Sequence, residues 1–377
     1  MILPTHARRL LLLSLALVLS PPSARALLNI DGARNQVFVF GSVSFAYSSN
    51  IFSESSGRGD YSTSAEAGVE VKRRAGIIAV NSTFKVSYQR FGKYAGENAL
   101  NPSFYIEFNK TVGRTTGAFT ISAFRESRSD SAVNLRTSSW NFPLGLSLKY
   151  PINDKFYVTS STSYLQRRYS SSSVLTNLTD YSEGLDLFYV YTSKLDLVGG
   201  YRLRVSRTTN GSNTSDHWFN VGATGSLFAK LNGTLRVGYQ IRNDRSGNEN
   251  FTHLNALAAL GWPVTRKISL SGQVSRDFNT IATGSSVDSS SVSLSAAYTF
   301  TRKLEFNSGV AYGRNLFLGR TVARRRDDFF SWNVGASYKF NEHLNLAASY
   351  TYFKNWSTFS FSDFDRQGLS FDVSSRF

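Results

Sequence analysis

The feature that most constrains this chain is a strict alternation of apolar and polar residues, clearest between Ser331 and Tyr352. Before a turn at residues 341–343 the apolar positions are Trp332, Val334, Ala336, Tyr338 and Phe340, and after it they are Leu344, Leu346, Ala348, Tyr350 and Tyr352. A period of two residues is that of a β-strand whose two faces meet different surroundings. Aromatic residues stand at the ends of this apolar face, which is typical of a strand between hydrocarbon and water.

The same hairpin unit recurs along most of the chain. Segments such as LSLKYPINDKFYV, GSLFAKLNGTLRVGY and SAAYTFTRKLEFNSG each hold an apolar strand, a polar turn and an apolar restart. Short turns are predicted at residues 73–76, 112–116, 151–154, 193–194, 229–232, 263–266, 301–303 and 341–343. About eight short turns therefore alternate with about nine longer polar segments, each of roughly ten to fifteen residues, which is the arrangement of an outer-membrane barrel.

This pattern predicts an all-β fold: a transmembrane, antiparallel, up-and-down β-barrel of about 18 strands, within a range of roughly 16–18. The short turns are expected to face the periplasm and the longer loops the cell exterior. The final strand, residues 369–377, must pair with the first, residues 37–47, to leave no open edge. A soluble repeat protein such as a propeller is the alternative, but aromatic residues near the turns favour a membrane girdle.

Composition and the N-terminus indicate export to an outer membrane. Of the 377 residues 41% are hydrophobic and none is Cys, which excludes disulfides and thiolate chemistry. The one continuous apolar run, residues 10–19, follows Arg8 and Arg9 and is too short to span a bilayer. With a small-x-small site at residues 24–26, it predicts a cleaved signal peptide at residues 1–26 and a single barrel domain at residues 27–377.

The end of the chain carries a second targeting feature. Leu369, Phe371, Val373 and Phe377 alternate and finish on an aromatic ring, like the C-terminal signature of outer-membrane barrels. We expect Phe377 to be the assembly signal that the barrel assembly machinery recognises. Too few residues precede the first strand for a soluble plug, which argues against a TonB-dependent transporter.

Residues of the inward parity are predicted to line the lumen. Five of them are basic: Lys85, Arg202, Arg204, Arg236 and Arg242. One interpretation is a cationic stripe in a water-filled passage, which favours anionic solutes or acidic sugars. The other is that these charges pair with acidic residues on nearby strands, such as Asp186 and Asp277, and brace the wall.

A second basic set lies at the outer strand ends and in the loops. Its members are Arg167, Arg168, Arg276, Arg314, Arg324, Arg325 and Arg326. The guanidinium fork binds phosphate and carboxylate groups bidentately, so lipopolysaccharide or an acidic polysaccharide are the natural ligands. Ordinary solvated loop charge is the alternative interpretation.

Catalysis finds little support in the sequence. His217 and His253, with Ser215 and Asp216 nearby, are the one imaginable rim site, in a region where Ser and Asp are common everywhere. We therefore expect no enzyme, no cofactor and no metal site. The net charge of +16 is spread around a membrane-patterned chain with no nucleic-acid module, so nucleic acid is set aside as a partner.

Three segments resemble a known family. NVGASYKFNEHLNLAASYTYFKN, FDRQGLSFDVSSRF and YSTSAEAGVEVKRRAGIIAVN are similar to strands of the porin-like outer-membrane β-barrels that accompany exopolysaccharide and capsule biosynthesis clusters in Gram-negative bacteria. The resemblance implies a part in export or surface attachment of a polysaccharide, and it brings no catalytic motif.

We accordingly expect a monomeric channel or accessory protein of the Gram-negative outer membrane that serves export or surface attachment of an acidic exopolysaccharide. Its other partners would be outer-membrane lipid, lipopolysaccharide and the barrel assembly machinery. Two alternatives stay open: a general or anion-selective diffusion porin, and a non-conducting structural or surface-binding barrel.

Overall fold

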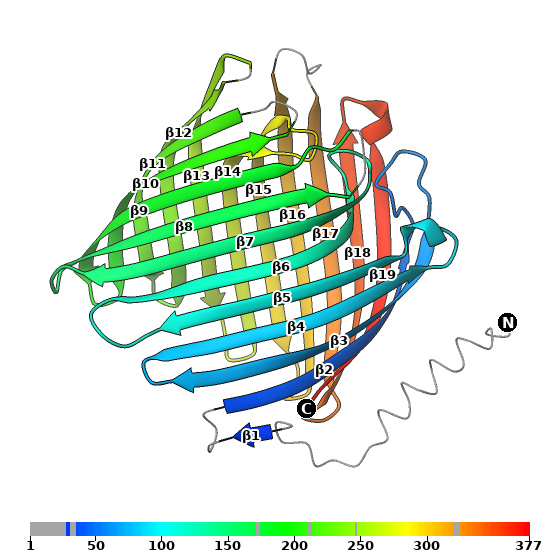
Figure 1. The fold of residues 1–377 in the computed structure, drawn as a ribbon, viewed down its shortest axis with the longest axis horizontal. Coiled ribbons are helices and arrows are strands. Elements are labelled where there is room, and N and C mark those ends of the chain that lie inside the picture. The colour runs from blue at the N-terminus through cyan, green and yellow to red at the C-terminus, as the bar shows by residue number, and fades with distance from the viewer. Residues whose placement is uncertain (1–27, 31–34, 171–173, 210–212, 246, 320–324) are drawn as a thin grey trace.

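The computed structural model describes residues 28–30, 35–170, 174–209, 213–245, 247–319 and 325–377, so the expected signal peptide, residues 1–26, lies outside the described residues. Eighteen antiparallel strands form a closed wall (Figure 1). They are β2 (Asn35–Ser48), β3 (Asp60–Ala75), β4 (Ile78–Phe91), β5 (Ala99–Lys110), β6 (Thr116–Asp130), β7 (Leu135–Pro151), β8 (Phe156–Tyr169), β9 (Leu178–Thr192), β10 (Leu195–Thr208), β11 (Asn213–Phe228), β12 (Leu231–Asp244), β13 (Glu249–Pro263), β14 (Ile268–Thr280), β15 (Ser286–Thr299), β16 (Leu304–Leu318), β17 (Arg326–Lys339), β18 (Leu344–Ser357) and β19 (Phe364–Arg376).

Three short elements accompany the wall. The strand β1 (Leu28–Ile30) pairs with the start of β2, and two 3₁₀ helices, η1 (Ala95–Glu97) and η2 (Ser360–Ser362), lie in outer loops. No helix in the described part of the chain is long and apolar enough to cross a membrane.

The barrel closes between its first and last long strands, as expected. The closing pairs run from Gly368 with Ser48 to Arg376 with Phe40. Beyond them Phe377 and Val39 exchange two main-chain hydrogen bonds, at 2.8 and 3.0 Å. In Figure 1 the red β19 accordingly lies beside the blue β2. Closure satisfies the edge N–H and C=O groups that hydrocarbon would leave without partners.

The two faces of the wall follow the alternation in the sequence. Trp332 and Tyr352 are partners across β17 and β18, as are Val334 and Tyr350. Trp332 is 39% exposed on the outer face, and more polar than apolar side chains are buried in the described structure as a whole. This distribution of apolar and polar side chains is the reverse of that in a soluble protein. A barrel in lipid requires it, because hydrocarbon covers the apolar outer face and the polar face lines the lumen.

Four of the short turns share one local device. In the β17–β18 turn, Asn341 Oδ1 accepts hydrogen bonds from the backbone N–H groups of His343 and Leu344, at 2.8 and 2.7 Å. Asn153, Thr265 and Thr301 do the same in their own turns. Asn and Thr serve here because a short side-chain oxygen satisfies the N–H groups that a tight reversal leaves free.

The alternation of short turns and longer loops is confirmed, but most outer loops are shorter than the expected ten to fifteen residues. The β2–β3 loop, residues 49–59, has the expected length, whereas the β6–β7 loop runs only from residue 131 to 134. The strands are correspondingly long, up to the 17 residues of β7. Polar sequence that resembles loop thus continues as strand, since each added residue still gains hydrogen bonds to the neighbouring strand.

Candidate functional site

Four arginines of the inward parity gather on the lumen face of β10 and β12. We call Arg202, Arg204, Arg236 and Arg242 the arginine cluster. Strand β11 pairs with both β10 and β12, so side chains of the same parity stand next to one another across the three strands. Asp216, Trp218 and Asn220 of β11 face the lumen between the arginines.

Asp216 joins two members of the cluster. Its carboxylate accepts hydrogen bonds from Arg204 Nε at 2.7 Å and from Arg242 Nε and Nη2 at 2.6 and 2.8 Å. Arg242 is 0% exposed and Asp216 is 2% exposed. Two guanidinium groups therefore share one buried carboxylate, which leaves an excess of positive charge at this point.

Asp277 of β14 also contacts two members of the arginine cluster. Its carboxylate lies 3.1 Å from Arg202 Nη2 and 3.3 Å from Arg204 Nη2, and it accepts a 2.8 Å hydrogen bond from Gln240 Nε2. The Arg202 guanidinium also lies over the Trp218 ring, 4.3 Å from its centroid. Arg202 and Arg204 are thus held by a strand that lies four places away along the sheet.

Arg236 has its own partners lower on the same face. Its Nη1 donates to Asp186 Oδ2 at 2.8 Å and to Asn220 Oδ1 at 3.3 Å. A Cβ atom at Gly200 would stand 1.8 Å from Asp186 Oδ1, so glycine leaves the room that this ion pair occupies. Every member of the arginine cluster therefore has an acidic partner among Asp186, Asp216 and Asp277, and Asp180 adds a further negative charge near Arg204.

The outer ends of β14 and β15 lie inside the barrel, and we call residues 277–288 the inner hairpin. Among the described residues β14 pairs with β13 only from Ala256 with Arg276 to Pro263 with Ser269, whereas β12 pairs with β13 from residue 249 to 261. Above Arg276 the hairpin leaves the wall. Phe278 then stacks on the lumen-facing ring of His253, with 4.0 Å between centroids, and is 1% exposed.

Main-chain carbonyl groups of the inner hairpin also contact the arginine cluster. Arg242 Nη1 donates to the Asn279 carbonyl at 2.9 Å, and Arg204 Nη2 donates to the Phe278 carbonyl. Asp288, on β15, lies 3.2 Å from His253 Nδ1 and 2.8 Å from Arg276 Nη2. The hairpin therefore covers the inner surface of β10–β13 at the outer end of the lumen.

Outer loops meet across the mouth at two further places. Thr176, in the β8–β9 loop, donates its backbone N–H to the Ala282 carbonyl at the tip of the inner hairpin, at 2.8 Å. Elsewhere Asn134 of the β6–β7 loop donates to the Ser53 carbonyl and accepts from Ser362 Oγ, both at 2.5 Å. The loops thus narrow the outer opening.

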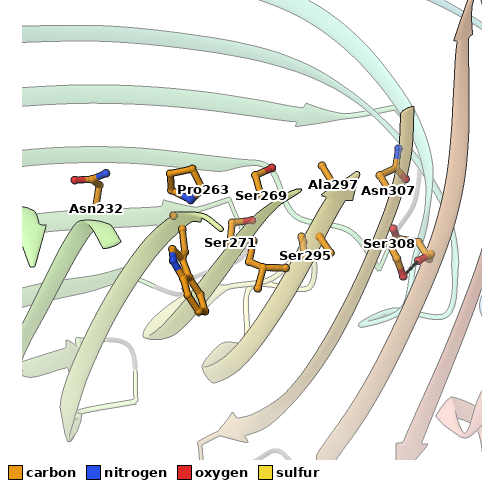
Figure 2. A pocket seen from close by; sticks show the side chains of 13 residues that line it. Asn232, Pro263, Ser269, Ser271, Ser295, Ala297, Asn307 and Ser308 are labelled. Carbon is orange, nitrogen blue, oxygen red and sulfur yellow. Dashed lines mark hydrogen bonds between the residues drawn. The ribbon is translucent and has the colours of Figure 1, made fainter. Parts of the chain in front are cut away.

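The periplasmic part of the lumen is hollow. A cavity of about 550 Å³ lies along β12–β17, and its lumen-facing lining includes Asn232, Ser295 and Asn307. Figure 2 shows these side chains with Pro263 and Ala297 across neighbouring strands. A second cavity, of about 800 Å³, lies at the turn end of β2–β4 and β17–β19. Around the first cavity, small polar side chains thus leave space below the arginine cluster.

The other predicted basic residues fall in several places. Lys85 pairs with Glu66 at 3.0 Å on the lumen side. Arg276 pairs with Asp288 of the inner hairpin. On the outer face, both Arg314 and Arg326 pair with Asp328, and Arg168 is exposed. Arg167 donates to Asn141 on the lumen side, and Arg325 is buried against Asp327 and the Ala132 carbonyl. Arg324 lies outside the described residues.

The structure does not bring together the residues considered for a catalytic site at the rim. His217 bonds through Nδ1 to the Tyr201 hydroxyl, at 2.8 Å, on the outer face, whereas His253 faces the lumen beside Gln240. Asp216 is held by two arginines. In the described part of the chain no group of three or more His, Cys, Asp or Glu residues could hold a metal ion.

The sequence pattern did not reveal the inner hairpin. Strand parity alone assigns Phe278 and Asp288 to the lipid face, because their partners along the sheet include outward residues such as Leu316. The sequence holds one weak indication of the inner hairpin. Asp288 stands at an outward position in a Ser-rich strand, near Arg276. Alternation describes the two faces of a sheet, but it cannot show where a sheet edge leaves its neighbour.

Comparison with known proteins agrees with this architecture. Residues 199–377 match the family described as "Putative beta-barrel porin 2". Pseudomonas aeruginosa OpdK, solved with vanillate, is similar with a TM-score of 0.54 and 11% identity over 90% of this chain and 99% of that one. Acinetobacter baumannii OccAB3 has a TM-score of 0.51 and 11% identity over 92% of this chain and 100% of that one.

A third similar structure is Pseudomonas aeruginosa OccK3 (OpdO), with a TM-score of 0.50 and 12% identity over 90% of this chain and 95% of that one. No curated protein matches the sequence significantly. At these identities the likeness concerns the fold. The chain is a porin-like β-barrel of the outer-membrane type, with 18 strands as predicted.

Proposed function

We propose that this protein is a passive outer-membrane channel that favours small anionic solutes, which is the anion-selective porin among the alternatives above. The observation that carries the proposal is the arginine cluster, which faces the lumen from β10 and β12 above a hollow with a neutral polar lining. Fixed positive charge in a passage with low-dielectric walls raises the local concentration of anions. The cluster therefore selects by charge, while its aspartates keep the side chains in place.

The similar structures supply a probe of suitable chemistry. OpdK was solved with vanillate, a small aromatic carboxylate, and the present chain shares its fold at 11% identity. A small carboxylate can accept the paired N–H groups of a guanidinium. We therefore take benzoate, which is simpler, as the test solute.

Export of an acidic exopolysaccharide is the second candidate function. The arginine cluster would suit the carboxylates of such a polymer as well. The contacts of Thr176 with Ala282 and of Asn134 with Ser53 across the mouth favour small solutes, because a polymer would need a wider opening.

Planar-bilayer recording of the refolded protein tests the proposal. We expect discrete conductance steps, a reversal potential in a KCl gradient that indicates anion preference, and a lower chloride current when benzoate is added. Block by an acidic oligosaccharide without an effect of benzoate would support the polysaccharide function. A folded barrel without conductance would contradict both and leave the structural or surface-binding alternative.

We further propose that the barrel is monomeric and that outward arginines near the rim contact lipopolysaccharide phosphates. Arg314 and Arg326 share Asp328 and are half exposed, so each guanidinium retains free donors. Replacing both by Gln should reduce the thermal stabilisation that lipopolysaccharide gives the barrel in detergent. An unchanged shift would mean that these arginines serve only Asp328.

A further inference from the structure

We propose that the inner hairpin is a gate, and that a small carboxylate solute opens it by taking the place of Asp277 on the arginine cluster. In the first position, here called tucked, the inner hairpin packs against the lumen side of β10–β13, as the structure shows. In the second position, here called zipped, β14 continues its pairing along the free edge of β13. This inference rests on the proposed function, since it concerns the regulation of the same anion site.

The first observation is a free strand edge. Residues 250–255 of β13 pair with β12, but within the described structure no strand pairs with their other side. Unpaired N–H and C=O groups on an edge are a ready template for another strand, and they are costly near hydrocarbon. Leu254, on the lipid face of this edge, is 72% exposed. This edge of β13 is therefore available to pair with the outer end of β14.

The second observation is that the alternation of β14 already suits the zipped position. Extending the register of Ala256 with Arg276 would pair Leu254 with Phe278 and Asn255 with Asp277. Phe278 would then join Leu254 on the lipid face, and Asp277 would join Asn255 on the lumen face. A segment whose pattern satisfies two packings is the kind of element that can switch between them.

The third observation is that the Asp277 carboxylate binds the arginines in the way that the carboxylate of a solute would. It receives hydrogen bonds from Arg202, Arg204 and Gln240, which come from two different strands. In the zipped position β14 would lie four strands from β10, roughly 19 Å along the wall at about 4.8 Å per strand, too far for this contact. The hairpin and a free carboxylate therefore compete for the same donors, and binding of the solute shifts the population toward the zipped position.

Disulfide trapping tests this directly, because the chain contains no native Cys. Thr176→Cys with Ala282→Cys reports the tucked position, since the backbones of these residues are hydrogen-bonded at 2.8 Å. Thr252→Cys with Thr280→Cys reports the zipped position, since the extended register makes them partners. The three threonine replacements nearly conserve side-chain volume.

Ala258→Cys with Val274→Cys is the matched control, because these residues are partners below the point of separation in either position. Cross-linking of folded barrels in liposomes would be followed by mass spectrometry with and without benzoate. We expect benzoate to slow the tucked cross-link and to speed the zipped one, each several-fold, and to leave the control unchanged. Asp277→Asn should favour the zipped cross-link without benzoate.

Conductance of the trapped barrels completes the test. The tucked disulfide should lower the single-channel conductance several-fold relative to the control pair, and the zipped disulfide should raise it. Absence of the zipped cross-link in barrels that form the control cross-link would overturn the gate, and so would equal conductance in both traps. If no barrel conducts, the control included, the proposed channel function is refuted. The response of cross-linking to benzoate would then still decide whether the hairpin moves.

Discussion

His253 and Phe278 stack ring against ring, 4.0 Å between centroids, although strand parity places them on opposite faces of the wall. The contact is possible because the outer end of β14 lies on the lumen side of β13. Both rings are buried beside the place where β13 and β14 separate. The contact also brings Asp277, the neighbour of Phe278, within reach of the arginine cluster.

Reversing charge at Arg236 should change ion selectivity and leave assembly intact. Arg236→Glu would set a second carboxylate beside Asp186, whereas Asp186→Asn would leave Arg236 with Asn220 alone. One unit charge at about 4 Å in water is worth about 1 kcal/mol, so Asp186→Asn, a change of one unit, should raise the anion-to-cation permeability ratio roughly five-fold, and Arg236→Glu, a change of two units, should lower it roughly 30-fold. Reversal potentials at low salt measure this, and equal potentials in both variants would mean that the pair only braces the wall.

Removing the shared carboxylate Asp216 should destabilise the barrel. Asp216→Ala would leave the buried guanidinium groups of Arg204 and Arg242 without their common partner, which should cost about 3–5 kcal/mol. Asp328→Ala breaks a comparable pair of contacts with the half-exposed Arg314 and Arg326, and should cost about 1 kcal/mol or less. Urea unfolding in detergent compares the two, and equal losses would argue against a buried network.

A charge on the lipid face should impair assembly. Leu235 and Val237 face outward from β12 and are 47% and 53% exposed where lipid would cover them. Replacing either by Arg should cost about 2–4 kcal/mol near the membrane centre. Ser293→Arg on the lumen face of β15 is the control and should assemble normally. Heat-modifiable mobility on gels gives the folded fraction, and similar fractions for all three variants would contradict the assigned faces.

Loss of the terminal ring should affect assembly in cells more than the folded barrel. The Phe377 ring stacks on His343 at 5.3 Å, while its main chain pairs with Val39. Phe377→Ala keeps the main-chain bonds, so refolding in detergent should be nearly unchanged, whereas the amount of folded protein in the outer membrane should fall several-fold. If both quantities fall together, the residue acts through closure of the barrel and not as an assembly signal.

The sequence by itself determined the class of fold. A period of two with aromatic ends, as between Trp332 and Tyr352, specifies a wall with one apolar and one polar face. The Asn and Thr residues of the short turns, such as Asn341 and Thr301, are local devices that act within three residues. The inward parity of Arg202 and Arg236 follows from the same period. All of these are properties of neighbouring residues, so one sequence is enough to show them.

Tertiary structure alone decided which charges meet and where the lumen narrows. Arg204 and Asp277 are 73 residues apart, and their contact depends on the outer end of β14 leaving β13. The burial of Arg325 against the Ala132 carbonyl, 193 residues away, likewise depends on loops from distant strands. Alternation fixes the face on which a side chain lies, but the path of a sheet edge is set by the balance between pairing along the wall and packing inside it.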